Sequence, residues 1–167
     1  MDTTISISAD TKEDTYQQLI PQIRSLLDGE SDLIANLANV GAALKTGFQK
    51  ISWVGFYLLK DGELILGPFQ GKPACVRIKL GKGVCGTAAE QRETIIVPDV
   101  NKFPGHIVCD ADSKSEIVVP IVYRGRVAGV LDLDSNEFNS FDLIDSKYLA
   151  SILSLISFNE IATAEEQ

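Results

Sequence analysis

Hydrophobic side chains recur at helical spacing in two stretches near the start of the chain. The first stretch covers residues 16–27, contains Pro21 as a kink or a late start, and stops at Gly29. The second stretch follows Ser31, a residue type that caps helices, and stops at Gly47. Each stretch presents one apolar stripe if it is helical, so we expect two consecutive helices.

The centre of the chain contains short runs that are rich in β-branched and aromatic residues. The runs expected to form strands are residues 51–59, 64–69, 75–80, 94–97, 117–123 and 127–133. Asp61-Gly62 lies between the first two runs and is a strong signal for a two-residue hairpin turn. Arg124-Gly125-Arg126 separates the last two runs, which we expect to form a second hairpin.

Two segments interrupt this strand pattern. The glycines Gly81 and Gly83 lead into a short helix that is expected to contain Cys85. Residues 99–115 are polar and irregular, and Cys109 lies among them. Because a loop of this length is unusual inside a domain, we interpret it as a lid or a binding element.

The end of the chain returns to a helical pattern, with an amphipathic stretch at residues 144–156. An antiparallel sheet flanked by N- and C-terminal helices is an α+β fold of the PAS-like kind. The chain contains no repeat and no linker of domain scale. We therefore expect one domain over residues 1–167, with an N-terminal helix in residues 1–30 and the core in residues 31–160.

Composition and charge exclude several classes of protein. The 167 residues are 45% hydrophobic and 23% charged, as in an ordinary globular domain. A formal net charge of −8 argues against nucleic-acid binding, which needs clustered Lys and Arg. No apolar run approaches the roughly 20 residues of a membrane span. The first residues also lack the pattern of a signal peptide, so we expect a cytoplasmic protein.

The cysteines are concentrated in one part of the chain. Cys75, Cys85 and Cys109 lie within 35 residues of each other, and the sequence contains no other cysteine. In a reducing compartment such thiols are more often chemical than structural. Carboxylates follow in the same region, at Asp110, Asp112, Glu116, Asp132 and Asp134. One thiol can attack a substrate and a second can resolve the product, and a nearby carboxyl can protonate a leaving oxygen. This combination favours two-electron thiol chemistry on a small polar substrate.

Asp132 and Asp134 alternate with Leu131 and Leu133, which places both carboxylates on one side of a strand. Two like charges there are costly unless a cation binds or a proton is shared, and the ammonium group of a free amino acid fits this need. With Glu116 they are the candidate proton donors to a leaving oxygen. A solvated sheet face is the alternative interpretation.

The residues alone favour Cys85 as the nucleophile, because the first turn of a helix stabilises a thiolate. The neighbouring Asp110 and Asp112 would raise the pKa of Cys109 if they are close, although His106 could offset them. Cys85 can equally be a buried packing residue, whereas packing explains a cysteine in a polar loop poorly.

The two aromatic residues of the first expected strand, Trp53 and Tyr57, are candidates for an apolar pocket that holds a methyl group. Aromatic residues on strands are more often core residues, so this assignment stays open at the level of the sequence.

Seven motifs in order along the chain resemble the free methionine-R-sulfoxide reductases, which are stand-alone GAF domains. They are WVGFY at 53–57, GPFQG at 67–71, AC at 74–75, GVCG at 83–86, HIVCD at 106–110, SKSEIV at 113–118 and GVLDLDS at 129–135. The resemblance implies a GAF fold and reduction of free methionine-(R)-sulfoxide. It also implies regeneration by thioredoxin with electrons from NADPH, and no bound cofactor or metal.

The resemblance further implies that Cys109 attacks the sulfoxide and that Cys75 resolves the product as a disulfide. It leaves Cys85 in a supporting or alternative resolving role. With the candidates named above, the expected catalytic residues are Cys109, Cys75, Cys85, Glu116 and Asp134. The expected substrate-binding residues are Trp53, Tyr57, Glu116, Asp132 and Asp134. Terminal helices often pair in GAF dimers, which makes a homodimer an open alternative to a monomer.

Three other functions remain alternatives. A non-catalytic GAF sensor of a small ligand would need no thiol chemistry. A zinc site could use Cys75, Cys85, Cys109 and His106, although close Cys-x-x-Cys pairs are lacking. The glycines near residue 83 could bind phosphate, but the P-loop Lys-Ser/Thr and a parallel βαβ context are missing.

Overall fold

The computed structural model describes residues 3–158 of the chain. Its elements, in chain order, are α1 (Lys12–Leu27), α2 (Leu33–Gly47), β1 (Ile51–Lys60), β2 (Glu63–Gln70), β3 (Arg77–Lys79), α3 (Gly83–Gln91), β4 (Ile95–Val97), the 3₁₀ helix η1 (Val100–Lys102), β5 (Ser115–Tyr123), β6 (Arg126–Ser135) and α4 (Leu143–Leu153). The helices and strands occur in the order that the sequence predicts. The last residues of the expected core lie outside the described part.

The helix ends differ from the expectation where side-chain capping decides them. Thr11 caps α1 by accepting a hydrogen bond from the backbone N–H of Asp14, and Pro21 lies inside the helix. The late start at Pro21 is therefore wrong. Asp32, rather than Ser31, caps α2 through the backbone N–H of Ala35, because a carboxylate accepts this bond readily.

The two expected hairpins are confirmed. Asp61 and Gly62 have φ values of 50° and 79°, the left-handed geometry of a tight hairpin turn. Arg124 and Gly125 repeat it with φ values of 50° and 75°, so Arg126 already belongs to β6. β3 has three residues where six were expected, because only part of that run pairs with β2.

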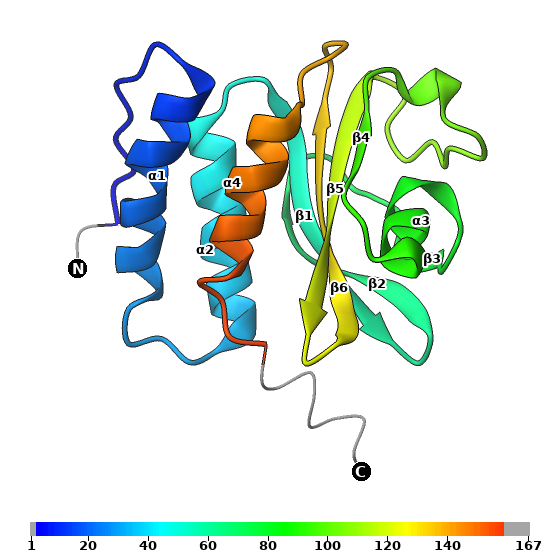
Figure 1. Ribbon diagram of the computed structural model, residues 1–167, viewed down its shortest axis with the longest axis horizontal. Coiled ribbons are helices and arrows are strands. Elements are labelled where there is room, and N and C mark those ends of the chain that lie inside the picture. Colours follow the sequence, from blue (N-terminus) through cyan, green and yellow to red (C-terminus); the bar gives the residue numbers. More distant parts are fainter. Residues whose placement is uncertain (1–2, 159–167) are drawn as a thin grey trace.

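The strands form one antiparallel sheet in the order β3-β2-β1-β6-β5-β4. Figure 1 shows α1, α2 and α4 on one side of this sheet, and α3 with the connections around it on the other. This arrangement confirms the expected α+β class. None of the helices in residues 3–158 has the length and hydropathy that a membrane crossing requires.

Alternation along the central strands divides the core between the two faces of the sheet. On β6, Leu131 and Leu133 join the cluster that packs against α1, α2 and α4. Val130 faces the other way, into a smaller cluster with α3, and Asp132 lies between the two leucines on that same side. The second face is thus the one on which the chain places polar chemistry.

Candidate active site

Cys75 and Cys109 form a disulfide with a Cα–Cα distance of 5.7 Å. Cys75 lies just before β3, and Cys109 lies in the loop between η1 and β5. The distance is within the usual range for disulfides, so the loop closes onto the sheet edge, as the expected pairing requires. The bond also occupies two sulfurs of the zinc set proposed from the sequence, so that set is not formed in this structure.

Hydrogen bonds and ion pairs hold both halves of the disulfide. The Tyr57 hydroxyl donates to the carbonyl of Cys75 at 2.9 Å, and the Trp53 indole N–H donates to the carbonyl of Lys72 at 3.0 Å. The Lys72 ammonium contacts Asp110 at 3.1 Å and Asp112 at 2.6 Å, on the loop that carries Cys109. Lys72 was missed from the sequence, although it lies three residues before a cysteine.

The Trp53 side chain fills a space that two glycines leave open. A Cβ atom at Gly55 would lie 2.4 Å from the Trp53 ring, and one at Gly71 would lie 2.5 Å from it. The indole is 4% exposed and stacks on Phe69 with ring centroids 5.5 Å apart. Both glycines belong to the motifs that carried the family resemblance, and this close approach gives those motifs a physical reason.

Three carboxylates converge from β5 and β6 beneath the loop. Glu116 and Asp134 are direct cross-strand partners, and Asp132 pairs with Val118 one step along the same face. Glu116 and Asp132 are each 6% exposed, which excludes the solvated sheet face for these two residues. The Ser113 hydroxyl donates to Asp134 at 2.7 Å.

Burial and mutual repulsion both disfavour ionisation of the three carboxyls. Desolvation raises the pKa of Glu116 well above its ordinary range, and the charges of Asp132 and Asp134 raise it further. The pKa of Asp132 is likewise raised well above its ordinary range, first by burial and then by Asp134. Burial raises the pKa of Asp134 to about 6, although the hydrogen bond from Ser113 acts in the opposite direction.

Cys85 is a free thiol in the first turn of α3, as expected, but its environment does not favour a thiolate. It is 4% exposed, and burial followed by the charges of Asp132 and Glu116 raises its pKa well above the ordinary value. The helix-terminus argument that favoured Cys85 as the nucleophile is therefore wrong, because desolvation and two carboxylates outweigh the dipole.

His106 lies over the carboxylates rather than beside the aspartates that follow Cys109. Its Nε2 is 3.8 Å from a carboxylate oxygen of Glu116, and burial lowers the pKa of the imidazole. A neutral ring at that distance forms neither an ion pair nor a hydrogen bond. Asp110 and Asp112 contact Lys72 instead, and this compensates the charges that were expected to disfavour the Cys109 thiolate.

The disulfide and the carboxylates border one cavity of about 40 Å³, which has room for a few water molecules. Seven of the eight site residues expected from the sequence line it, and Cys75 is joined to the wall through its bond to Cys109. A larger hollow of about 720 Å³ lies at the sheet edge around β4, and its walls contain none of those eight residues.

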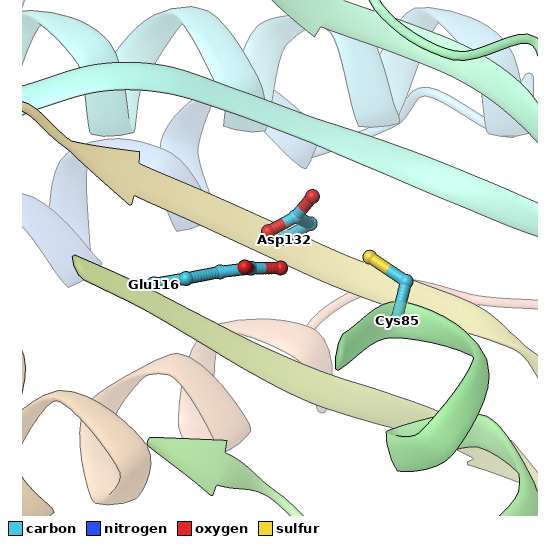
Figure 2. Close-up of side chains that lie close together, drawn as sticks. All are labelled: Cys85, Glu116 and Asp132. Carbon is cyan, nitrogen blue, oxygen red and sulfur yellow. The ribbon is translucent and has the colours of Figure 1, made fainter. Parts of the chain in front are cut away.

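Figure 2 shows Cys85, Glu116 and Asp132 pointing toward one another from α3, β5 and β6. One potential ligand atom from each lies within 4.8 Å of the others, so these three residues could hold a metal ion. Oδ1 of Asp132 is buried and has no hydrogen-bond partner among the residues that the structure describes. The site thus leaves acceptor capacity for a positively charged or proton-donating group.

Comparisons with known proteins agree with this geometry. The family model of the GAF domain matches residues 30–159. The chain is 58% identical over 153 residues to GAF domain-containing protein A of Dictyostelium discoideum, with 91% of this chain and 96% of that protein covered. It is 46% identical to the free methionine-R-sulfoxide reductase of Saccharomyces cerevisiae, with coverages of 87% and 86%. The solved structure of free methionine-R-sulfoxide reductase from Neisseria meningitidis in complex with its substrate aligns with a TM-score of 0.90 at 45% identity, covering 92% of this chain and 93% of that one. The chain therefore belongs to the GAF-domain family of free methionine-R-sulfoxide reductases.

Proposed function

We propose that this protein reduces free methionine-(R)-sulfoxide to methionine with its own thiols. The observation that carries the proposal is the Cys75–Cys109 disulfide, which borders a cavity lined by buried carboxyls whose pKa values are raised by burial. Reduction of a sulfoxide requires both the thiols and the carboxyls, because a thiol must attack the sulfur and an acid must protonate the oxygen.

In the proposed reaction the Cys109 sulfur attacks the sulfoxide sulfur, and oxygen transfer yields methionine and a Cys109 sulfenic acid. The Cys75 thiol then attacks the sulfenic sulfur, which forms the disulfide and releases water. The sulfoxide is thereby reduced by two electrons and the two cysteines are oxidised by two. Cys109 is the proposed nucleophile, Cys75 the resolving thiol, and Cys85 a supporting residue.

The carboxylate cluster is proposed to act both as acid and as binding site. A protonated Glu116 or Asp134 supplies the proton that the leaving oxygen requires. The unpartnered oxygen of Asp132 is suited to accept a hydrogen bond from the ammonium of a free amino acid. Trp53 and Tyr57 line the cavity and would contact the methyl group.

The small volume of the cavity assigns this form to one step of the catalytic cycle. A volume of about 40 Å³ admits a few waters but not an amino acid, so we assign this form to the oxidised product state. Reduction of the disulfide frees the loop and readmits substrate. We propose thioredoxin with NADPH as the source of these electrons. A ligand sensor would have no use for a thiol pair beside the cavity, which favours the enzyme over that alternative.

The test compares free, N-acetylated and peptide-bound methionine sulfoxide under the same reductant. Acetylation removes the positive charge that the carboxylates would bind, and it should lower kcat/KM on the order of a hundredfold. Peptide-bound sulfoxide should be excluded by the loop. Equal rates on all three substrates would refute the enclosed site, and absence of methionine formation from the free R sulfoxide would refute the function.

A further inference from the structure

Exposed apolar side chains lie next to both bonded cysteines along the chain. Val76 and Val108 are each one residue from a bonded cysteine, and their exposed fractions are 62% and 66%. Ile107 adds a third apolar side chain that is 38% exposed. We call Val76, Ile107 and Val108 the apolar collar. Exposed apolar groups gathered at a reactive bond are typical of a contact surface rather than of a core.

The collar stands out within the molecule. The described residues expose nine large hydrophobic side chains, and three of them lie within two positions of the disulfide. The collar is also held in place: the Val76 carbonyl accepts a hydrogen bond from the N–H of Leu66 at 3.0 Å, and Ile107 packs against Gly83 at the start of α3. A partner would therefore meet a largely preformed surface.

The segment that carries Cys75 and Val76 has a charge opposite to that of the protein as a whole. Residues 72–82, which carry Cys75, contain four Lys or Arg and no Asp or Glu, in a chain of net charge −8. Lys72 and Arg77 are paired with carboxylates, whereas Lys79 and Lys82 have no ion-pair partner within residues 3–158. On the Cys75 side of the disulfide the surface therefore favours a partner with acidic groups at its edge, while Asp110 and Asp112 on the Cys109 side are paired with Lys72.

We propose that the apolar collar is the docking surface for a protein dithiol reductant of the thioredoxin class, with Lys79 steering its acidic edge. The inference deepens the proposed function, since turnover there requires this disulfide to be reduced. A thiolate of the partner attacks one sulfur of the Cys75–Cys109 bond and releases the other as a thiolate. The second thiol of the partner then attacks the partner's own sulfur in this mixed disulfide and releases the bound cysteine as a thiolate. The partner is left oxidised and both cysteines are left reduced. Cys109, an exposed residue, makes this bond reachable from outside.

The experiment measures reduction of the purified oxidised protein, so it needs no sulfoxide. Free thiols are counted over time after mixing with reduced thioredoxin or, separately, with dithiothreitol. The double variant Val76→Ser, Val108→Ser removes two apolar contacts, and its second-order rate constant with thioredoxin should fall roughly tenfold. Its rate with dithiothreitol, which has no docking surface, should stay within about twofold of the parent rate. Val122→Ser, which alters a valine that is 48% exposed on β5, is the matched control and should change neither rate.

Lys79→Glu extends the test to steering. This variant should lower the rate constant for reduction by thioredoxin about threefold at low salt, and the difference should disappear at high salt. An unchanged thioredoxin rate in the double variant would overturn the proposal. So would equal losses with both reductants, which would show that the valines protect or shape the bond itself. A parent dimer that the double variant converts to a monomer, measured by light scattering, would assign the collar to a second copy of the chain and also overturn it. None of these outcomes depends on sulfoxide reduction, which the substrate comparison tests separately.

Discussion

Two buried carboxylates on opposite sides of the sheet have contrasting surroundings. Asp145, at the start of α4, is 2% exposed and accepts a hydrogen bond from the Tyr16 hydroxyl at 2.8 Å. It also contacts the Lys12 ammonium and the backbone N–H of Asp142. Asp132, on β6, is 6% exposed, but its neighbours are Glu116, Asp134 and the Cys85 thiol.

The difference separates a structural carboxylate from a functional one. The Tyr16 hydroxyl, the Lys12 ammonium and a backbone N–H all face the Asp145 carboxylate, so the group joins α1 to α4 as part of the folded structure. Around Asp132 the fold leaves an oxygen without a partner and gathers like charges, which costs folding free energy. A cost of this kind persists where a ligand or a proton compensates it during function.

The largest expected effect tests which thiol is the nucleophile on the face of the sheet that carries Asp132. Cys109→Ser should lower methionine formation by a thousandfold or more, because a hydroxyl is a far weaker nucleophile than a thiolate. Cys85→Ser should retain activity within about tenfold, since its thiol stays protonated in the buried cluster. The assay is methionine release with dithiothreitol, and circular dichroism checks the fold. A dead Cys85→Ser beside an active Cys109→Ser would exchange the two roles.

The second prediction concerns Asp132, whose Oδ1 has no hydrogen-bond partner among the described residues. Asp132→Asn should lower kcat/KM for free methionine sulfoxide by about a hundredfold, because the acceptor for the substrate is weakened. The free energy of unfolding, measured in urea, should be unchanged or higher, since a source of repulsion is removed. A destabilised variant with parental activity would show that Asp132 is structural after all.

The third prediction tests the structural role of Asp145. Asp145→Asn removes the charge that Lys12 and Tyr16 stabilise, and it should lower the free energy of unfolding by about 2 kcal/mol, a value reduced by the partial exposure of Lys12. The activity of the folded fraction should not change. Asp10→Asn, at an exposed position, is the control for loss of a negative charge. If Asp145→Asn lowered activity without affecting stability, the division between the faces would be wrong.

The smallest expected effect is a pH dependence of stability. The pKa of Asp134 rises from 3.8 to about 6 on folding, so the folded state binds its proton more tightly than the unfolded state. This contribution is complete below pH 3.8 and is lost as the pH rises through about 6. The contribution of Asp134 to the free energy of unfolding is at most about 3 kcal/mol. We expect about 1–2 kcal/mol, because Asp134 is partly exposed.

The measurement compares urea unfolding of the parent and of Asp134→Asn at pH 4 and pH 7. Between pH 4 and pH 7, the free energy of unfolding of the variant should fall by about 1–2 kcal/mol less than that of the parent. Identical pH dependence in the two proteins would mean that Asp134 titrates normally and that the cluster does not hold its proton.

Much of the fold could be predicted from local sequence. Helical periodicity placed α1, α2 and α4, and the turn sequences at Asp61-Gly62 and Arg124-Gly125 placed both hairpins, because these signals depend on neighbours in the chain. Alternation along β6 correctly put Asp132 and Asp134 on one face. The ordered motifs correctly indicated the family, since they carry residues such as Gly55 that the Trp53 side chain requires.

Contacts between distant segments were decided only by the tertiary structure. The sequence indicated a thiolate at Cys85, but burial against carboxylates of β5 and β6 keeps that thiol protonated. The ion pairs of Lys72 with the Cys109 loop span about 40 residues and have no local signature. Likewise, alternation along the strand singled out Asp132 as a candidate, but no local pattern indicated the partners of Asp145 or the missing partner of Asp132. Their opposite characters arise because a carboxylate's energy depends on desolvation and on the charges brought near it, and both are fixed only when the chain folds.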